Sequence, residues 1–146
     1  MSATLYDKDF YKWALEQAHY IKTKAFDKLD IEHLFEEVES MGKHEQRELV
    51  SRLRTLLVHL LKWKYQPNRQ SRSWQLTIKE QRKELQSHLK ENPSLKNPET
   101  FKEKFFDAYE TAILKAANET GLDESVFPQI CEWNLDQILD NEFYPN

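Results

Sequence analysis

The chain has 146 residues, a net charge of −4, 39% hydrophobic residues and a mean hydropathy of −0.83. This length suits one domain, and the apolar content is too high for a disordered chain. No apolar run approaches the roughly 18 residues of a membrane span, and the N-terminus lacks the basic and apolar regions of a secretory signal. We therefore expect a single domain over residues 1–146 that lies in the cytoplasm and has no membrane partner.

Helix breakers are scarce in this sequence, which has two Gly and five Pro. They fall between segments whose apolar residues recur at three- and four-residue steps, a spacing typical of amphipathic helices. The fold class is therefore expected to be all-α, a single helical bundle of about five main helices followed by short C-terminal helical turns. The lone cysteine, Cys131, cannot form an internal disulfide, in agreement with a reducing compartment.

The first two predicted helices cover residues 7–24 and 31–41. Asp30 is expected to cap the second, and Gly42 is expected to end it in a left-handed conformation. Each helix has one mostly apolar stripe, and that of the second is expected to face the core. The stripes consist of Phe10, Trp13, Ala14, Gln17 and Ile21 in the first helix and of Ile31, Leu34, Phe35, Val38 and Met41 in the second.

The third predicted helix, residues 43–65, has the widest apolar stripe and is expected to be central in the bundle, ending before Pro67. Ser73 is expected to cap a fourth helix, whose apolar side is thin because Gln81 and Arg82 occupy its middle. The apolar positions are Leu49, Val50, Leu53, Leu56, Leu57, Leu60 and Leu61 in the third helix and Trp74, Ile78, Leu85 and Leu89 in the fourth.

Capping signals mark the helices nearer the C-terminus. Asn97, which precedes a proline, is expected to start the fifth helix, and Gly121 is expected to end it. One short helix is expected to begin at residues 125–128. Asn134 and Gln137 form a capping-box pattern that predicts another.

The middle of the chain is basic and both ends are acidic. The net charge is −4 over residues 1–42, +8 over residues 43–90 and −8 over residues 91–146. The basic residues of a candidate phosphate-binding face are Arg47, Arg52, Arg54, Lys62, Lys64, Arg69, Arg72, Lys79, Arg82 and Lys83.

Two interpretations of this basic segment are open. In the first, it binds nucleic acid, and Trp63 and Trp74 stack on bases. In the second, the basic helices pack against acidic ones and the charges neutralise each other within the domain. We favour the second, because nucleic-acid-binding domains usually have a basic pI and this chain has a pI of about 5.8.

A histidine lies beside the leucine stripe of the third helix. Arg52, Leu56, His59 and Trp63 follow steps of four, three and four residues, so they share one flank of that helix. His59 at the edge of the core is a candidate general base or ligand. A hydrogen-bonded packing role for His59 is the favoured alternative.

Carboxylates and guanidinium groups form a second candidate cluster. Glu36 and Glu39 share one face of the second helix, while Arg72 and Arg82 come from the segment around the fourth. Because Arg82 interrupts an apolar stripe, its guanidinium requires a carboxylate or a carbonyl partner, and Glu36 or Glu39 is expected to supply it. The role expected for this cluster is structural.

Several kinds of site are not supported. Di-iron bundles need a Glu-x-x-His motif on each of two helices, and only residues 16–19 have that spacing, so no metal is expected. With Gly42 and Gly121 as the only glycines, no phosphate-binding loop or dinucleotide fingerprint is present, and no cofactor is expected. Acidic neighbours of Cys131 disfavour a reactive thiolate.

Read as a whole, the chain resembles a bacterial helical family, abundant in cyanobacteria, that is named domain of unknown function 29. Glu132 and Asn134 depart from the Pro and Thr expected there. The resemblance implies an all-helical fold and no established activity, substrate or cofactor. It rests on DFYKW at 9–13, LFEEVESMG at 34–42, HLLKW at 59–63, SRSW at 71–74, TI at 77–78, QR at 81–82, ETGL at 119–122 and CEWNLDQILD at 131–140.

These observations favour a non-enzymatic binding or protein-interaction domain, with a protein partner or a second copy of the chain. One alternative is an enzyme in which His59 acts as base and the arginines bind an anionic substrate. Another is a nucleic-acid-binding module. The residues expected at the binding site are Glu36, Glu39, His59, Trp63, Arg72, Trp74 and Arg82.

Overall fold

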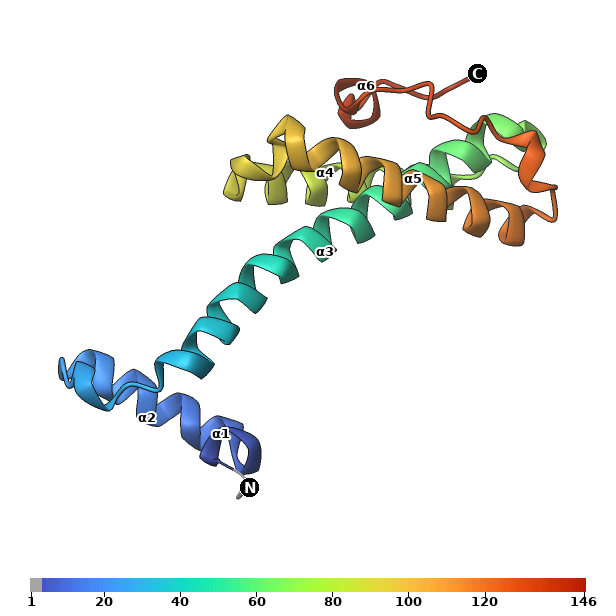
Figure 1. Ribbon diagram of the computed structural model, residues 1–146. Helices are drawn as coiled ribbons and strands as arrows, with labels where there is room; N and C mark the ends of the chain where they lie inside the picture. Colours follow the sequence, from blue (N-terminus) through green and yellow to red (C-terminus); the bar gives the residue numbers. More distant parts are fainter. Residues whose placement is uncertain (1–3) are drawn as a thin grey trace. The chain divides into compact units, whose positions relative to one another are not determined.

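The computed structural model describes residues 4–146, and over these residues it contains helices and no strand (Figure 1). The all-α prediction is therefore confirmed. The helices are α1 (Leu5–Lys8), α2 (Phe10–Lys22), α3 (Ile31–Tyr65), α4 (Arg72–Glu91), α5 (Pro98–Thr120) and α6 (Leu135–Leu139).

The chain divides into two compact units, Met1–His44 and Glu45–Asn146, which we call the N-terminal unit and the C-terminal unit. Helix α3 runs without interruption through the boundary between them. The single domain over residues 1–146 stays a prediction. Within residues 4–146, no helix combines the length and the apolar character needed to cross a membrane.

The predicted helix end at Gly42 is wrong, because α3 continues through this residue. Among the described glycines only Gly121 has a positive φ, 76°, and it occupies the left-handed position after α5 as predicted. A glycine inside a helix costs about 1 kcal/mol relative to alanine. Ending and restarting the helix would leave several backbone groups without partners, so continuation through Gly42 is favoured.

The two glycines predict opposite effects of the same substitution. Gly42→Ala is expected to raise the free energy of unfolding by about 0.5–1 kcal/mol, because an added Cβ meets no atom within 4 Å and the helix interior favours alanine. Gly121→Ala is expected to lower it by about 1 kcal/mol, because alanine is strained at positive φ. Urea denaturation of both variants measures the difference. Destabilisation by Gly42→Ala would contradict the continuous helix.

In the N-terminal unit, α1 and α2 pack against the first turns of α3. The predicted helix at 7–24 is broken at Asp9, whose side chain accepts a hydrogen bond from the Lys12 amide (3.0 Å) and caps α2. Trp13 and Gln17 are buried. Both contact Asp30: the Trp13 indole donates to its carboxylate (2.9 Å), and the Gln17 amide oxygen accepts from its backbone N–H (2.8 Å).

Most of the apolar stripe residues in this unit are exposed, and for the stripe of α3 this contradicts the expectation that it faces the core. On α3 these are Ile31, Phe35, Val38 and Met41, while Leu34 is half-buried. On α2, Phe10 and Ile21 are also exposed. Periodicity correctly located the helices, but it does not determine which apolar faces are covered within one chain.

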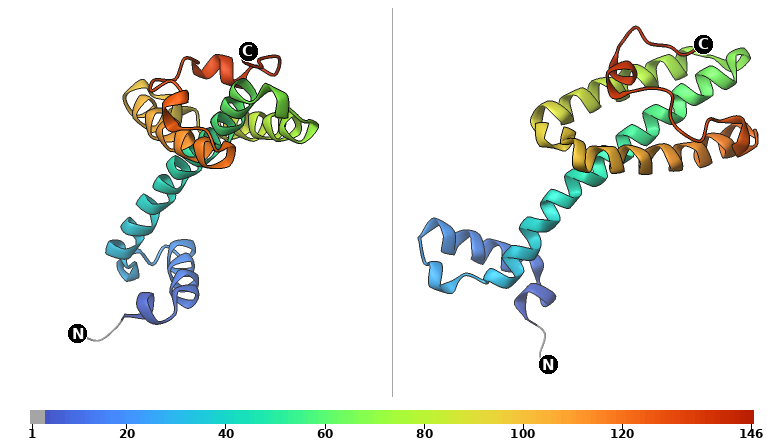
Figure 2. Two further views of the ribbon diagram at one scale, coloured as in Figure 1. Left: turned by 90° about the vertical axis from the view of Figure 1, so that its right-hand side faces the viewer. Right: turned by 45° about the horizontal axis from the view of Figure 1, so that its top comes forward.

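The C-terminal unit holds the hydrophobic core, where the second half of α3 lies beside α4 and α5 (Figure 2). The leucine stripe predicted for α3 is confirmed as buried, since Leu53, Leu56 and Leu57 are fully buried. On α5 the contact positions include Ala112 and Ala116, also fully buried, whose small side chains allow close approach of the helices.

Most of the helix ends in this unit lie at the capping residues that the sequence predicts. Asn97 caps α5 as predicted, and Asn134 forms with Gln137 the predicted capping box of α6. The predicted cap of α4 is wrong by two residues, because the hydroxyl of Ser71 accepts the Trp74 amide hydrogen at 3.2 Å. The short helix expected at 125–128 is a 3₁₀ turn over Glu124–Val126.

Candidate functional site

The two predicted acidic residues of the N-terminal unit are solvent-exposed. Glu36 and Glu39 lie on α3. The Glu39 carboxylate accepts a hydrogen bond from Lys43 Nζ, four residues later on the same helix, at 3.3 Å. An exposed pair at this spacing stabilises a helix by about 0.3–0.5 kcal/mol. The contacts of Glu39 are therefore those of a surface residue.

Arg82 is the largest fully buried side chain of the described residues, with 1% of its surface exposed. The expected carboxylate partner is wrong, because the guanidinium donates to three backbone carbonyls. Nε donates to Ile138 O (2.7 Å), Nη1 to Asn141 O (3.4 Å) and Nη2 to Phe143 O. Burial lowers the pKa of Arg82. The carbonyl partner that the sequence also allowed is the one present.

These hydrogen bonds attach the C-terminal segment, residues 138–144, to α4. Gln86, one turn after Arg82, donates to Leu139 O at 2.8 Å. The Tyr144 ring lies 5.3 Å from the Arg82 guanidinium carbon and 4.9 Å from the Trp63 ring. Trp63 and Arg82 are thus brought together through Tyr144. Their shared contact holds the C-terminal segment in place, and the guanidinium is too deeply buried to be reached by an anionic substrate.

His59 is half-buried on α3 and bonded to its own helix. Its Nδ1 donates to the Thr55 carbonyl oxygen at 2.9 Å. Burial has the largest effect on the pKa of His59 and lowers it, and the hydrogen bond to Thr55 O, which raises the pKa, does not offset this effect. The ring is therefore neutral at pH 7, in agreement with the packing role that we favoured.

The basic segment is partly neutralised within the C-terminal unit. Lys62 lies 3.7 Å from a Glu119 carboxylate oxygen and 4.8 Å from the centre of the Trp74 ring. Lys64 donates to Glu132 at 3.0 Å. Both acidic partners come from the acidic last third of the chain, as the neutralisation interpretation expects. Arg72, the last of the seven residues predicted for the binding site, is exposed at the start of α4.

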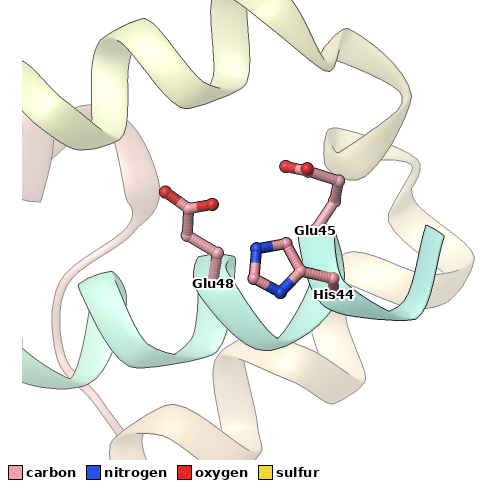
Figure 3. Close-up of side chains that lie close together, drawn as sticks. All are labelled: His44, Glu45 and Glu48. Atoms are coloured by element: carbon pink, nitrogen blue, oxygen red, sulfur yellow. The ribbon is translucent and has the colours of Figure 1, made fainter. Parts of the chain in front are cut away.

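A polar cluster between α3 and α4 was not predicted. Figure 3 shows His44, Glu45 and Glu48, whose potential metal-binding atoms lie within 4.8 Å of one another. On α4, the buried His88 places Nε2 at 2.7 Å from Glu45 and 3.7 Å from Glu48. His44 and Glu48 are one helical turn apart, a spacing that the sequence shows. No pairing rule links Glu45 to His88, 43 positions later, so only the packing of the helices brings His88 to this cluster.

The chemistry of this cluster does not suit a metal ion bound by His88. A histidine that binds a metal through Nε2 donates its Nδ1–H to an acceptor. In the described residues, Nδ1 of His88 is buried and has no hydrogen-bond partner. Metal binding at Nε2 would therefore bury an unpaired N–H, whereas a hydrogen bond from Nε2–H to Glu45 leaves only a lone pair at Nδ1. The geometry fits a structural hydrogen bond.

The apolar surface of the N-terminal unit is a further feature that was not predicted as a site. Nine large hydrophobic side chains within residues 4–44 are each at least half exposed. The sequence signal that locates them, apolar periodicity, is the same signal that locates a core. The nine are Phe10, Tyr11, Leu15, Ile21, Phe26, Ile31, Phe35, Val38 and Met41.

Comparisons with known proteins identify a family but no characterised relative. No curated protein and no solved structure matches the chain. One family model, described as "Domain of unknown function DUF29", matches residues 5–144. This match covers nearly the whole chain and agrees with the resemblance seen in the motifs. The chain therefore belongs to the DUF29 family, whose function is unknown.

Proposed function

We propose that the protein is a non-enzymatic interaction domain that associates with a second copy of itself through the apolar surface of the N-terminal unit. The observation that carries this proposal is the exposure of the nine large hydrophobic side chains of that surface. Large exposed apolar side chains concentrated in one part of a protein are typical of interaction sites.

The small core of the N-terminal unit supports this proposal. Among its described residues, Trp13 is the one large apolar side chain that is buried. Segments of about 40 residues rarely fold stably without a disulfide, a metal or association. A second copy supplies the missing apolar contacts.

The spacing of the apolar residues on α3 favours α3 of a second copy as the partner. Ile31, Leu34, Val38 and Met41 follow steps of three, four and three residues, the a and d positions of a coiled coil. β-Branched residues at a with leucine at d favour two-stranded association. Ile31 and Val38 take the a positions and are exposed. The d positions are taken by Leu34, which is half-buried, and Met41, which is exposed.

The exposed area matches that of a stable dimer. A large apolar side chain that is fully exposed presents about 100 Å² of surface to water. Nine side chains that are each about half exposed therefore present on the order of 500 Å² per copy and about 1000 Å² per pair. A standard interface buries about 1600 Å², of which a little over half is apolar.

The contacts of the other predicted residues support an interaction domain over an enzyme. The Arg82 guanidinium is occupied by three carbonyls, and His59 donates to its own helix. A general base and an anion-binding arginine need a shared substrate position. A cytoplasmic location in a bacterium is part of this proposal and is supported by the family resemblance and the lone cysteine.

Analytical ultracentrifugation of the full chain tests this proposal. The wild-type chain is expected to sediment as a dimer, with twice the 17.6 kDa mass of one copy. Val38→Asp is expected to weaken the dimer at least about tenfold, because two carboxylates would be buried at a self-complementary seam. Helix content should stay unchanged, since Val38 is exposed.

The matched control is Leu76→Asp, which places the same charge at an exposed leucine of α4 in the C-terminal unit. This variant is expected to dimerise like the wild-type chain. A monomeric wild-type chain at about 100 μM, or equal dimerisation of the Val38→Asp variant, would show that the N-terminal surface does not bind a second copy.

A further inference from the structure

The C-terminal unit has an open groove of about 1190 Å³ between α5 and the segment 123–130. We propose that this groove binds a basic amphipathic helix of a partner protein. It lies in a different unit from the self-association surface, and none of the seven sequence-predicted site residues lines it. The two sites therefore rest on independent observations.

The groove is built on a fixed framework. Gly121 turns the chain after α5, and the Tyr109 hydroxyl donates to the Pro128 carbonyl oxygen at 2.6 Å, which fastens the segment to the helix. Phe127 is buried, and its ring packs in a T-shaped arrangement with that of Tyr65, with the ring centroids 5.2 Å apart. A groove with both walls held in this way is already formed before a ligand binds, which lowers the cost of binding.

Both walls of the groove carry exposed apolar side chains. Phe106 and Leu114 of α5 and Ile130 of the opposite segment all line it, and each is more than half exposed. Ile130, at 79%, is the most exposed large hydrophobic residue of the described chain. Apolar side chains gathered on both walls of a groove indicate a site for an apolar ligand surface.

The charge at the groove has one sign. Its lining includes the carboxylates of Glu110, Asp123 and Glu124 and no Lys, Arg or His. Hydrogen bonds from the Ser125 hydroxyl and amide lower the pKa of Asp123, so this group is ionised at neutral pH. A ligand that is apolar on one side and cationic at its edges matches the groove in both respects.

The size of the groove favours a helix over a small molecule. Small-molecule cavities hold about 300–1000 Å³ and enclose the ligand, whereas this groove is larger and open. A helix with its side chains is about 10 Å across and buries only one face in a groove, so an open groove suits it better than an enclosed cavity would. Helix-in-groove binding uses apolar anchors at three- and four-residue steps, which the two apolar walls would contact.

A synthetic helical peptide tests this inference with the full-length chain. The probe is a fluorescein-labelled 14-residue peptide, with Leu at one helical face and Lys elsewhere, titrated by fluorescence anisotropy. Binding is expected to saturate at one peptide per chain. Leu114→Ser is expected to weaken it about tenfold, the loss typical of removing one interface anchor. Leu76→Ser is the matched control, since Leu76 is 50% exposed against 51% for Leu114 and does not line the groove.

Charge reversal separates the apolar and electrostatic parts of the inference. A peptide with Glu in place of every Lys is expected to bind at least about tenfold more weakly. The Glu110→Gln, Glu124→Gln double variant is expected to reduce the salt dependence of Leu/Lys peptide binding. Absence of binding, equal weakening by Leu114→Ser and Leu76→Ser, or equal affinity for both peptides would overturn the proposal. The Val38→Asp variant, which is expected to lose self-association, should bind the peptide like the wild-type chain. Loss of peptide binding and loss of self-association can therefore be distinguished.

Discussion

Arg82→Ala is expected to lower the free energy of unfolding by about 3 kcal/mol or more. The guanidinium donates to the carbonyls of Ile138, Asn141 and Phe143, and its side chain is fully buried. The bond to Ile138 O is buried and the other two are partly buried. A buried carbonyl left without a donor costs about 1–3 kcal/mol, and the missing side chain also leaves a cavity. Thermal and urea denaturation measure the loss.

One further variant separates the hydrogen bonds of Arg82 from its charge, and a second is a control at the neighbouring position. Arg82→Lys is expected to recover only part of the stability, because one ammonium cannot reproduce the planar arrangement of donors. Lys83→Ala, at the next and exposed position, is expected to have little effect. In Arg82→Ala the C-terminal segment should also become sensitive to proteases. An unchanged melting temperature of Arg82→Ala would refute the structural role.

Asp30→Ala is expected to cost about 2 kcal/mol and to affect the N-terminal unit first. The Asp30 carboxylate accepts hydrogen bonds from the Trp13 indole (2.9 Å) and the His33 ring (2.7 Å), and it caps the first turn of α3 through the His33 amide (3.3 Å). Loss of an N-cap alone costs about 1 kcal/mol, and the Trp13 N–H would lose its partner. Because the chain has four tryptophans, the NMR signal of the Trp13 indole N–H, followed during denaturation, reports this change. Asp27→Ala, at an exposed acidic position of the preceding turn, is the control.

The contact between Asp30 and His33 predicts that the stability of the N-terminal unit depends on pH. The hydrogen bond to Asp30 raises the pKa of His33. Desolvation raises the pKa of Asp30, but hydrogen bonds from His33 and Trp13 outweigh it and lower that pKa. The contribution of protonated His33 is thus complete below its unfolded pKa of about 6.5 and is lost as pH rises through its higher folded value. The contribution of ionised Asp30 is lost as pH falls through its lowered folded value.

Denaturation followed at several pH values between about 5 and 9 tests this expectation. The N-terminal unit of the wild-type chain should lose stability toward high pH, and Asp30→Asn should remove most of this slope. An NMR titration should also find the pKa of His33 above that of a free histidine. Equal slopes in the two proteins would show that the pair does not stabilise this unit.

Local signals determined much of the fold from the sequence. Asn97, Gly121 and Asn134 act on backbone groups within a few residues of themselves, so their helix ends were predicted correctly. The leucine stripe of α3 was also assigned correctly to the core, because it is long and lacks charged interruptions. Gly42 was misread, since a glycine ends a helix only where φ is positive, and the helix formers around it outweigh its cost.

The candidate sites depended on tertiary structure. Arg82 was predicted to need a buried partner, but the choice between a carboxylate and carbonyls rests on where the C-terminal segment packs, more than 50 residues away. Likewise, no local pattern shows that Phe106 and Ile130 lie on opposite walls of one groove.

The stripe at Ile31 and Val38 shows the same limit. Both this stripe and the core stripe at Leu53 and Leu57 have apolar residues at helical spacing. Ile31 and Val38 are nevertheless exposed, whereas Leu53 and Leu57 are buried. Helical periodicity arises from the backbone of a single segment, and so the sequence by itself determined the helices and their apolar faces. Burial depends on which surfaces meet after the chain folds, and only the tertiary structure decided which faces form the core and which remain available to a partner.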